Sequence, residues 1–317
     1  MMKKFVKLGV VVLTTMMFGT CAAQQVHKSL PSEGVTSVSV ENQQGKVTVT
    51  AWEKDSVEVD GEITDKAEKF VFERSGDRII IKVVLPDYGH KGHRREHDSI
   101  FTVKLPSSMR FDFAGIASDI SLTGLAKNSE VETVSGNIDA KNLSDYIDIS
   151  TVSGNIVSQG LAGKIRLATV SGDIKDQQSD GQLDLKAVSG NINTRSTAKE
   201  LRINNVSGDI DFSLADVDEL KVSTVSGEVE GQLALNENGL LKMSSVSGDF
   251  NIAFTNEVQA NFKMSANAGG QLINRITNDK AQHAKYGPSA KLRFTTGNGS
   301  ASVKATTVSG RIVVRED

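Results

Sequence analysis

The sequence contains few of the residues that cross-link, kink or anchor small folds. Its 317 residues include one cysteine and four prolines, and aromatic residues make up 5% of the chain. A single cysteine excludes an internal disulfide framework. A formal net charge of −3 gives no overall basic excess of the kind that nucleic-acid binding requires. Valine, isoleucine and leucine occur in short runs, which favours many small strands over long helices.

Residues 1–23 have the features of an export signal. Lys3, Lys4 and Lys7 form a basic start, residues from Phe5 to Phe18 are mostly apolar, and small residues from Gly19 to Ala23 suit cleavage. The apolar stretch is too short to span a bilayer comfortably. Cleavage after Ala22 or Ala23 removes three lysines and no acid, so the formal charge changes from −3 to −6. We therefore predict an exported protein that is periplasmic or associated with the cell envelope.

Cys21 is a candidate lipid anchor. The segment from Phe18 to Cys21 resembles the signal of bacterial lipoproteins, in which the cysteine carries the lipid. Thr20 fits that pattern poorly, whereas cleavage after Ala22 or Ala23 has small residues at both recognition positions. Soluble export is therefore favoured over a lipoprotein, and both alternatives stay open.

The most informative feature is a repeated Val-Ser-Gly triplet. The first five copies start 18 positions apart, the next two steps are 19 and 21 positions long, and the last step is 62 positions long. A fixed period of roughly 20 residues is typical of solenoids and other repeat arrays. The triplets begin at Val134, Val152, Val170, Val188, Val206, Val225, Val246 and Val308.

Each copy has the pattern of two short strands joined at a corner. Ile147, Ile149, Val152 and Ile156 are the apolar positions of one copy, and similar residues recur 18 positions later. Residues two apart share one side of a strand, so Ile147 and Ile149 should both face inward. At the corner we expect valine and isoleucine to fill the core and glycine to supply a positive φ. Serine and Asn or Asp should stack along the array.

Two folds could use this unit. A stack of β-hairpins would pair its strands antiparallel, with Gly-Asn or Gly-Asp as the turn. A parallel β-solenoid places one copy on each coil, of about 18 residues, so that like residues stack on like. The constant copy length and the constant apolar columns favour the solenoid. The sequence predicts an all-β fold, a parallel β-solenoid (β-helix), with right-handed coiling as the default.

The chain divides into four predicted segments. Residues 1–23 are the signal peptide, 24–110 the N-terminal β turns and cap, 111–254 the regular repeat solenoid, and 255–317 the irregular C-terminal coils and cap. Polar stretches at Pro86–Ser99 and Asn274–Pro288 are expected to be loops inserted into coils. The last turn, which ends at Asp317, is expected to close the C-terminal end.

These repeats resemble the bacterial "putative adhesin" family of β-strand-repeat proteins, a domain of unknown function. The resemblance rests on the serial Val-Ser-Gly-Asn/Asp-Ile corners, on the strand end at Val103–Pro106, and on the closing copy at Thr306–Ile312. It covers nearly all of the mature chain. It implies a β-solenoid at the cell envelope, and it brings no catalytic residue or cofactor.

Two sets of side chains are candidate metal ligands: His90, His93 and His97 in the first loop, and Asp209, Glu228 and Asp249 in the column after the corner glycines. The histidines stand among arginines and lysines that would repel a cation. The acids would lie about 5 Å apart, where their repulsion in water is only about 1 kcal/mol. We therefore predict a solvated loop and a column of turn residues rather than metal sites.

For function, the sequence favours a module over an enzyme. Solenoid enzymes that act on polysaccharides need acids and bases clustered in a groove. Acids here are scattered over the repeats, as at Asp139, Asp148, Asp184 and Asp211. We predict an exported non-enzymatic β-solenoid that acts as a structural or adhesion-like module at the bacterial cell envelope, with an unidentified envelope or surface partner. The alternative is a β-helical polysaccharide lyase or hydrolase.

Overall fold

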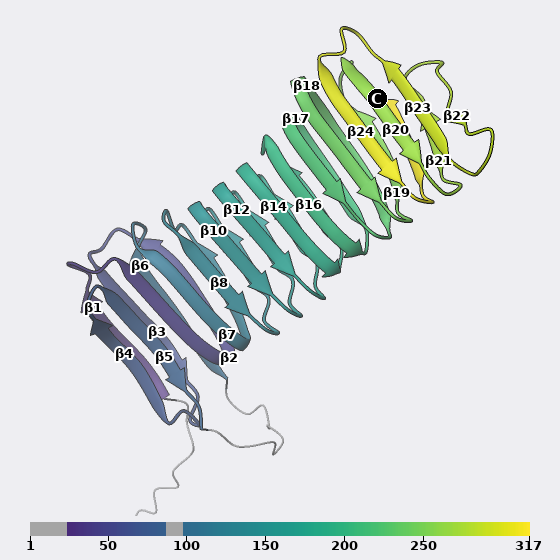
Figure 1. Cartoon of the computed structure of the whole chain (residues 1–317). Coiled ribbons are helices and arrows are strands. Elements are labelled where there is room, and N and C mark those ends of the chain that lie inside the picture. Colours follow the sequence, from purple (N-terminus) through teal and green to yellow (C-terminus); the bar gives the residue numbers. More distant parts are fainter. Residues whose placement is uncertain (1–23, 87–97) are drawn as a thin grey trace, which may run out of the picture.

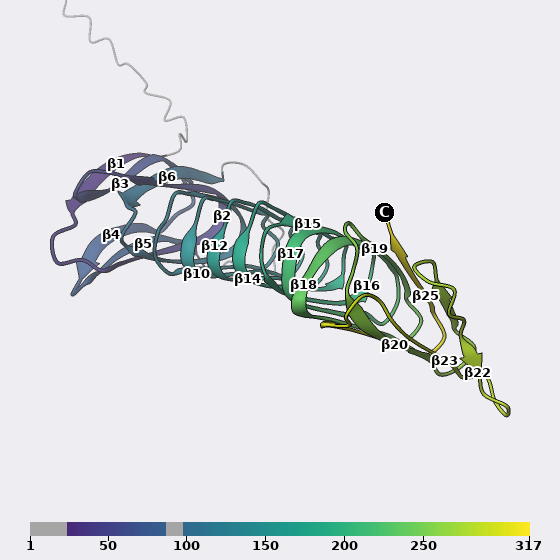
Figure 2. The same cartoon turned by 90° about the horizontal axis from the view of Figure 1, so that it is seen from above.

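The computed structural model describes residues 24–86 and 98–317, which form an elongated rod of β-strands (Figure 1). The proposed signal segment and His90, His93 and His97 lie outside these residues. Within the described ranges there is no helix of the length and apolarity that crossing a bilayer requires. Seen along the perpendicular view, the coils are flattened into two layers that enclose the core (Figure 2).

All 25 described strands belong to one continuous sheet that is folded into these two layers. Four long strands, β2 (Ser37–Trp52), β7 (Arg110–Thr123), β17 (Ile210–Ser223) and β18 (Glu228–Ser245), contribute to both layers. Between β7 and β17, the first layer contains β8 (Ser129–Thr133), β10 (Ser144–Thr151), β12 (Ala162–Thr169), β14 (Asp180–Ser189) and β16 (Glu200–Ser207). The second layer contains β9 (Ile138–Lys141), β11 (Ile156–Gln159), β13 (Ile174–Gln177) and β15 (Ile192–Ser196).

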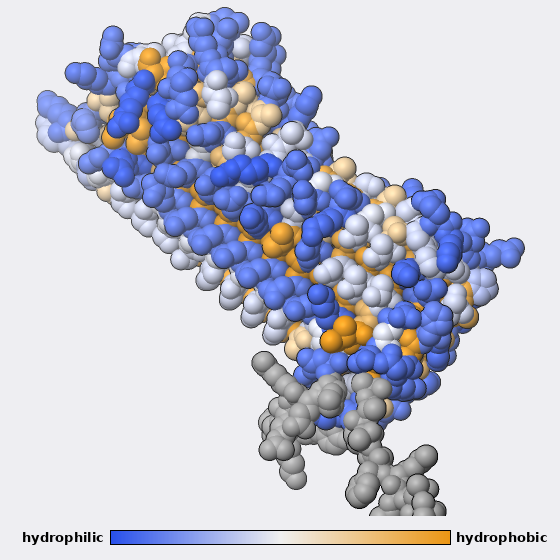
Figure 3. All heavy atoms as spheres, turned by 180° about the vertical axis from the view of Figure 1, so that it is seen from behind, coloured by the Kyte–Doolittle hydropathy of each residue, from blue (hydrophilic) through white to orange (hydrophobic). Residues whose placement is uncertain are grey.

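Neighbouring strands of the repeat region run parallel, so the stack of hairpins is wrong and the β-solenoid is right. Ile147 lies opposite Ile165, and Ile165 lies opposite Leu183, each 18 positions further along the chain. On the first layer the register then lengthens with the spacing of the triplets, by 19 positions from β16 to β17 and by 21 positions from β17 to β18. Side chains of one kind therefore form rows along the rod (Figure 3).

The N-terminal end is closed by antiparallel strands. On the first layer β2 pairs with β5 (Arg78–Val84), which pairs antiparallel with β4 (Lys69–Ser75). On the second layer β2 pairs with β6 (Ser99–Pro106), and β3 (Ser56–Ile63) and β1 (Gln24–Pro31) follow antiparallel. These hairpins cover the end of the parallel array and shield it from pairing with other chains.

The C-terminal end differs from the expectation that the last turn closes it. The final strands β24 (Ala301–Thr307) and β25 (Arg311–Glu316) stack on the much earlier strands β18 and β19 (Asp249–Phe254). The intervening chain lies beyond them as β20 (Ala260–Ala266) and β21 (Gln271–Asn274). Antiparallel β23 (Ala290–Thr295) and β22 (Gln282–His283) complete the first layer. The last two triplets therefore lie on adjacent coils. The long stretch of sequence between them includes an excursion, β20–β23, which lies beyond the last coil.

Three of the four predicted apolar columns form the core, and the valine column does not. Ile147, Ile149 and Ile156 are buried, whereas Val152 is 43% exposed and the other triplet valines are similarly exposed. Strand alternation continues to Thr151, so the side chain of Thr151 faces inward and that of Val152 faces outward. Thr151 Oγ1 accepts from Gly154 N–H (3.1 Å) and donates to the Gly136 carbonyl (3.2 Å). The corner therefore places a buried hydroxyl where the sequence predicted valine.

The corner glycines are needed mainly for close approach. Of the eight, only Gly208 and Gly227 have a positive φ, at 119° and 115°. In Gly154 a Cβ would lie 1.8 Å from the carbonyl oxygen of Gly136 on the preceding coil. The expectation of a left-handed corner was wrong for most copies, because the stacking of backbone on backbone already excludes a side chain.

The predicted stacking of Asn and Asp after the glycines is present as a hydrogen-bond ladder. Asn137 Oδ1 accepts from Asn155 N–H (3.0 Å), and Asn155 Oδ1 accepts from Asp173 N–H (2.9 Å). The same contact continues to Glu228, whose N–H donates to Asp209 Oδ1 (2.9 Å). Each carboxyl or amide oxygen thus holds the next coil in register.

Candidate binding face

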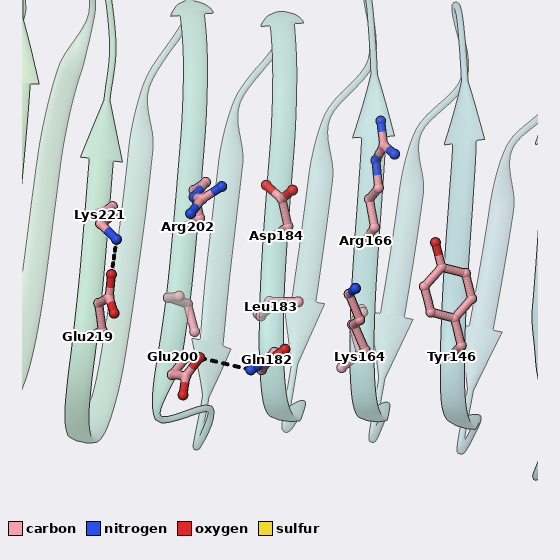
Figure 4. Close-up of a pocket in the computed structure, with 12 residues that line it drawn as sticks. Tyr146, Lys164, Arg166, Gln182, Leu183, Asp184, Glu200, Arg202, Glu219 and Lys221 are labelled. Atoms are coloured by element: carbon pink, nitrogen blue, oxygen red, sulfur yellow. Dashed lines mark hydrogen bonds and ion pairs between the residues drawn. The ribbon is translucent and has the colours of Figure 1, made fainter.

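The outer face of the first layer carries a continuous set of polar and charged side chains. Because Ile147 and Ile149 face the core, Tyr146 and Asp148 on the same strand face outward, and the pattern repeats on the next strands. A shallow groove of about 530 Å³ runs over β10, β12, β14, β16 and β17 (Figure 4). We call it the charged groove; the outward residues that line it are Tyr146, Lys164, Arg166, Gln182, Asp184, Glu200, Arg202, Glu219 and Lys221.

One end of the charged groove is formed by Tyr146. Lys164 Nζ lies 5.7 Å from the centre of the Tyr146 ring, within the range of a cation–π contact. The Tyr146 hydroxyl donates to Asp148 Oδ2 (3.4 Å), and Arg166 lies 3.7 Å from the same oxygen. This part of the groove offers an aromatic surface beside two cations.

The other end of the charged groove contains acids and cations side by side. Glu200 and Glu219 are opposite one another on neighbouring strands. Glu200 accepts a hydrogen bond from Gln182 (2.9 Å), and Glu219 is paired with Lys221. Arg202 has no ion-pair partner among residues 24–86 and 98–317. Both carboxylates are therefore already in contact with donors on an open sheet surface.

The scattered acids identified from the sequence do not come together. Each of the four pairs with a nearby cation: Asp139 with Lys141, Asp148 with Arg166, Asp184 with Lys186, and Asp211 with Arg195, at 3.0, 3.7, 2.9 and 2.7 Å. Such pairs on a solvated face contribute little to stability, about 0–1 kcal/mol each. They leave the outer face as a series of local pairs rather than a catalytic cluster.

The acidic column Asp209, Glu228 and Asp249 lies on adjacent coils, as the repeat predicts. The side chains are engaged along the rod, since Asp209 Oδ1 accepts from Glu228 N–H and Asp249 Oδ1 accepts from Arg311 N–H (2.7 Å). Arg311 Nη2 also lies 3.2 Å from Asp249 Oδ2. Across the described parts of the chain, no three His, Cys, Asp or Glu side chains are grouped in a way that could hold a metal ion.

Sequence reasoning missed a buried carboxyl in the core of the second layer. Asp176 on β13 is fully buried and accepts from Ser158 Oγ (2.6 Å), Ser179 Oγ (2.5 Å) and Thr194 Oγ1 (2.9 Å). Burial raises the pKa of Asp176 above its ordinary value, and the three hydroxyl donors oppose that rise. The sequence does indicate this position, because residues two apart share one side of a strand and Asp176 is two residues after the inward-facing Ile174. Asp176 is enclosed among these hydroxyls and faces no solvent.

Of the two predicted loops, the structure describes the Asn274–Pro288 segment. Most of Pro86–Ser99, including its histidines, is outside the described residues. The Asn274–Pro288 segment is ordered by Asn274, whose Oδ1 accepts from Ile276 N–H (2.9 Å) and whose Nδ2 donates to Thr277 Oγ1 (2.7 Å). Tyr286 at its tip is 84% exposed, with Lys285 Nζ 5.4 Å from the ring.

Trp52 stands at the end of β2 rather than in a binding platform. Its Nε1–H donates to the Ser56 carbonyl (2.8 Å), and the ring is half-buried. Lys54 and Lys104 lie over the ring at 4.8 and 5.7 Å.

Comparison with known proteins identifies a family. A family model described as Toastrack DUF4097 matches residues 35–240, which is more than half of the chain. Among solved structures, a putative cell adhesion protein from Clostridium sporogenes ATCC 15579 is similar at 9% sequence identity, over 93% of this chain and 100% of that chain. The TM-score of 0.23 is too low to support an argument from that structure. No curated protein matches the chain.

Proposed function

The chain belongs to the Toastrack DUF4097 family, and we propose that it is an exported, non-enzymatic β-solenoid acting as a structural or adhesion-like module at the bacterial cell envelope. The observation that carries the proposal is the continuity of the outer face. Rows of outward side chains pass from coil to coil, and the acids on them are paired locally with cations or amides. Such a surface suits contact with an extended partner, because equivalent groups are presented at regular intervals.

Export and the form of the mature protein are part of the proposal. The basic start, the apolar stretch and the small residues up to Ala23 support cleavage and release. Mass spectrometry of the mature N-terminus should find a chain that begins after Ala22 or Ala23. A lipid-modified chain that begins at Cys21 would instead establish a membrane-anchored lipoprotein.

We also propose that each regular coil holds one sequence repeat, and that the coils wind right-handed. The constant step in register from β10 to β12 and from β12 to β14 supports the coil length, because it equals the step between the triplets. The handedness rests on the general preference for right-handed crossovers between parallel strands.

The polysaccharide enzyme remains the second candidate because of one observation. Glu200 and Glu219 lie on neighbouring strands, whose spacing of about 4.8 Å is near the carboxyl separation of retaining glycosidases. Both acids, however, are held by Gln182 and Lys221 on an open surface. We therefore place the module first.

One experiment separates the two functions. Purified mature protein is incubated with isolated cell envelopes, and both co-sedimentation and the release of soluble sugar are measured. The module predicts co-sedimentation without sugar release, both for the wild type and for the Glu200→Gln/Glu219→Gln variant. Sugar release that this variant abolishes would establish the enzyme and overturn the module.

A further inference from the structure

Cations occupy the same outward position on six successive strands of the first layer. The strands β16, β17, β18, β24, β20 and β23 are neighbours at the C-terminal half of the rod (Figure 1). Register pairs join each cation to the next one along the layer. We call this set the cationic row; in spatial order it is Arg202, Lys221, Lys242, Lys304, Lys263 and Arg293.

The cationic row cannot be seen from the order of the sequence. Lys304 lies between Lys242 and Lys263 because β24 is inserted between β18 and β20. Arg293 joins the row through the antiparallel pairing of β23 with β20. The overall negative charge of the chain also conceals the row. Acids accompany it only at its β16–β17 end, where Asp184 lies opposite Arg202 and Glu219 pairs with Lys221.

Most of the cationic row has no countercharge within the protein. Among the described residues, Lys221 is the one member with an ion-pair partner, Glu219. The outward positions of β18 from Leu240 onward, and those of β24, β20 and β23, include no Asp or Glu. Like charges on neighbouring strands destabilise a sheet. Neighbouring strands are only about 4.8 Å apart, so the cations on them repel one another. An anionic partner laid along the row would remove this repulsion.

Hydroxyl and amide groups flank most of the cationic row, whereas Glu200 and Glu219 flank it at Arg202 and Lys221. On one side Ser223 and Ser244 are in contact (3.1 Å between Oγ atoms), and Ser265 Oγ donates to Thr306 Oγ1 (3.3 Å). On the other side Thr295 Oγ1 donates to Asn261 Oδ1 (2.8 Å). A ligand along the row would therefore meet charges in the centre and hydrogen-bonding groups at both edges. Acidic sugars carry both kinds of group on each unit.

The same face lacks what other polyanions need. Its outward positions on β18 (from Leu240), β24, β20 and β23 include no aromatic residue on which bases could stack, as in single-stranded nucleic-acid binding. They also include no exposed large apolar side chain to enter a bilayer, since Leu240 is half-buried. A flat row of cations fits an extended acidic chain better than it fits a single-stranded nucleic acid or a bilayer.

We propose that the cationic row binds a linear acidic polysaccharide, whose carboxylate or sulfate groups contact the row while its hydroxyls contact the flanking Ser, Thr and Asn side chains. The inference rests on the proposed binding module and specifies the chemical class of its partner. The chain would lie across the strands, along the axis of the rod, so that successive acidic units meet successive cations.

The test uses purified mature protein with two probes, heparin as a sulfated glycan and polygalacturonate as a carboxylated one, and dextran as a neutral control. Affinity is measured by calorimetry at low and at high salt. We expect binding to heparin or polygalacturonate and none to dextran, with weaker binding as salt screens the row. The Lys242→Gln/Lys263→Gln/Lys304→Gln variant should bind at least tenfold more weakly.

A matched variant controls for net charge. Lys127→Gln/Lys175→Gln/Lys199→Gln removes the same charge from positions outside the row and should change the affinity less than twofold. Equal loss in both variants, or tighter row-dependent binding of single-stranded DNA or anionic vesicles, would overturn the inference. Wild-type protein that co-sediments with envelopes but binds neither probe would also overturn it, while leaving the proposed module intact. Circular dichroism and thermal unfolding verify that both variants are folded.

Discussion

At the scale of single residues, each regular corner exposes the valine that the sequence predicted to be buried. Thr151 is buried at the corner and Val152 is exposed, because the hydroxyl satisfies the Gly154 N–H and the Gly136 carbonyl. An unpaired buried backbone group costs about 1–3 kcal/mol, which exceeds the gain from half-burying one more valine. The need to hydrogen-bond these buried backbone groups therefore decides which residue faces the core.

Asp176 provides a prediction for pH dependence. Because burial raises its pKa in the folded protein, its contribution to stability is fully present below the ordinary value of 3.8 and is lost as the pH rises through the raised pKa. Each unit of that rise costs about 1.4 kcal/mol. The Asp176→Asn variant avoids the cost, since an amide can still bond the three hydroxyls. Urea unfolding should find it more stable than wild type at pH 7, with the difference shrinking toward pH 4.

The control for this prediction is Asp139→Asn. Asp139 is a surface acid paired with Lys141, so its substitution should change stability by less than about 1 kcal/mol at either pH. The prediction would be contradicted if the wild type were more stable than Asp176→Asn at pH 7, because the ionised carboxylate would then be stabilising the fold.

At the scale of the element, one corner is held by three contacts that repeat with the coil. The glycine allows the backbone of one coil to approach the next, the threonine caps the turn, and the Asn or Asp oxygen binds the following N–H. Ala187 interrupts the threonine column, and Asn205 replaces threonine one coil later. There Asn205 Nδ2 donates to the carbonyls of Gly190 (3.0 Å) and Gly208 (2.9 Å), so the donor role of the threonine hydroxyl is kept by a different side chain.

Substitution of a corner glycine tests the close approach. In Gly154→Ala the new Cβ would lie 1.8 Å from the Gly136 carbonyl oxygen, so two coils must separate. We expect a loss of about 3 kcal/mol or more in the free energy of unfolding, measured by urea denaturation. Ser153→Ala in the same corner alters an exposed side chain and should cost less than about 0.5 kcal/mol. Similar costs for both variants would contradict the packing argument.

At the scale of the whole molecule, the two ends of the rod determine whether it stays a single molecule. Antiparallel hairpins cover the N-terminal end, and the excursion from β20 to β23 covers the C-terminal end. Without such covers, the terminal coil would offer unpaired N–H and C=O groups to another copy.

Removing residues 255–317 should convert the protein into end-to-end assemblies. The truncation exposes the edges of β18 and β19, which in the whole chain pair with β24 and β25. Size-exclusion chromatography with light scattering should find concentration-dependent oligomers, whereas the full chain stays monomeric. Adding Ser244→Lys and Asn251→Lys to the truncated chain should reduce assembly through charge repulsion at the new edge. A truncated chain that remains monomeric at all concentrations would contradict the role of the cap.

The sequence by itself determined the all-β class, the parallel stacking and the register. Ile147, Ile165 and Leu183 recur at one spacing because in-register coils place like residues on one another, so periodicity alone reports the contact. It also predicted the Asn and Asp ladder for the same reason. It could not determine that Val152 faces outward, because both sides of a corner can accept a valine and only the backbone hydrogen bonds distinguish them.

The tertiary structure alone decided the order of strands at the C-terminal end and the surface that results from it. Lys242, Lys304 and Lys263 are far apart in the sequence, and their alignment depends on β24 entering between β18 and β20. The triplet at Val308 stacks on the one at Val246, but the sequence does not show that the chain between them passes beyond this coil. A chain with few cysteines, prolines and aromatics thus carries its architecture in a repeat, and its candidate binding surface in the place where the repeat is interrupted.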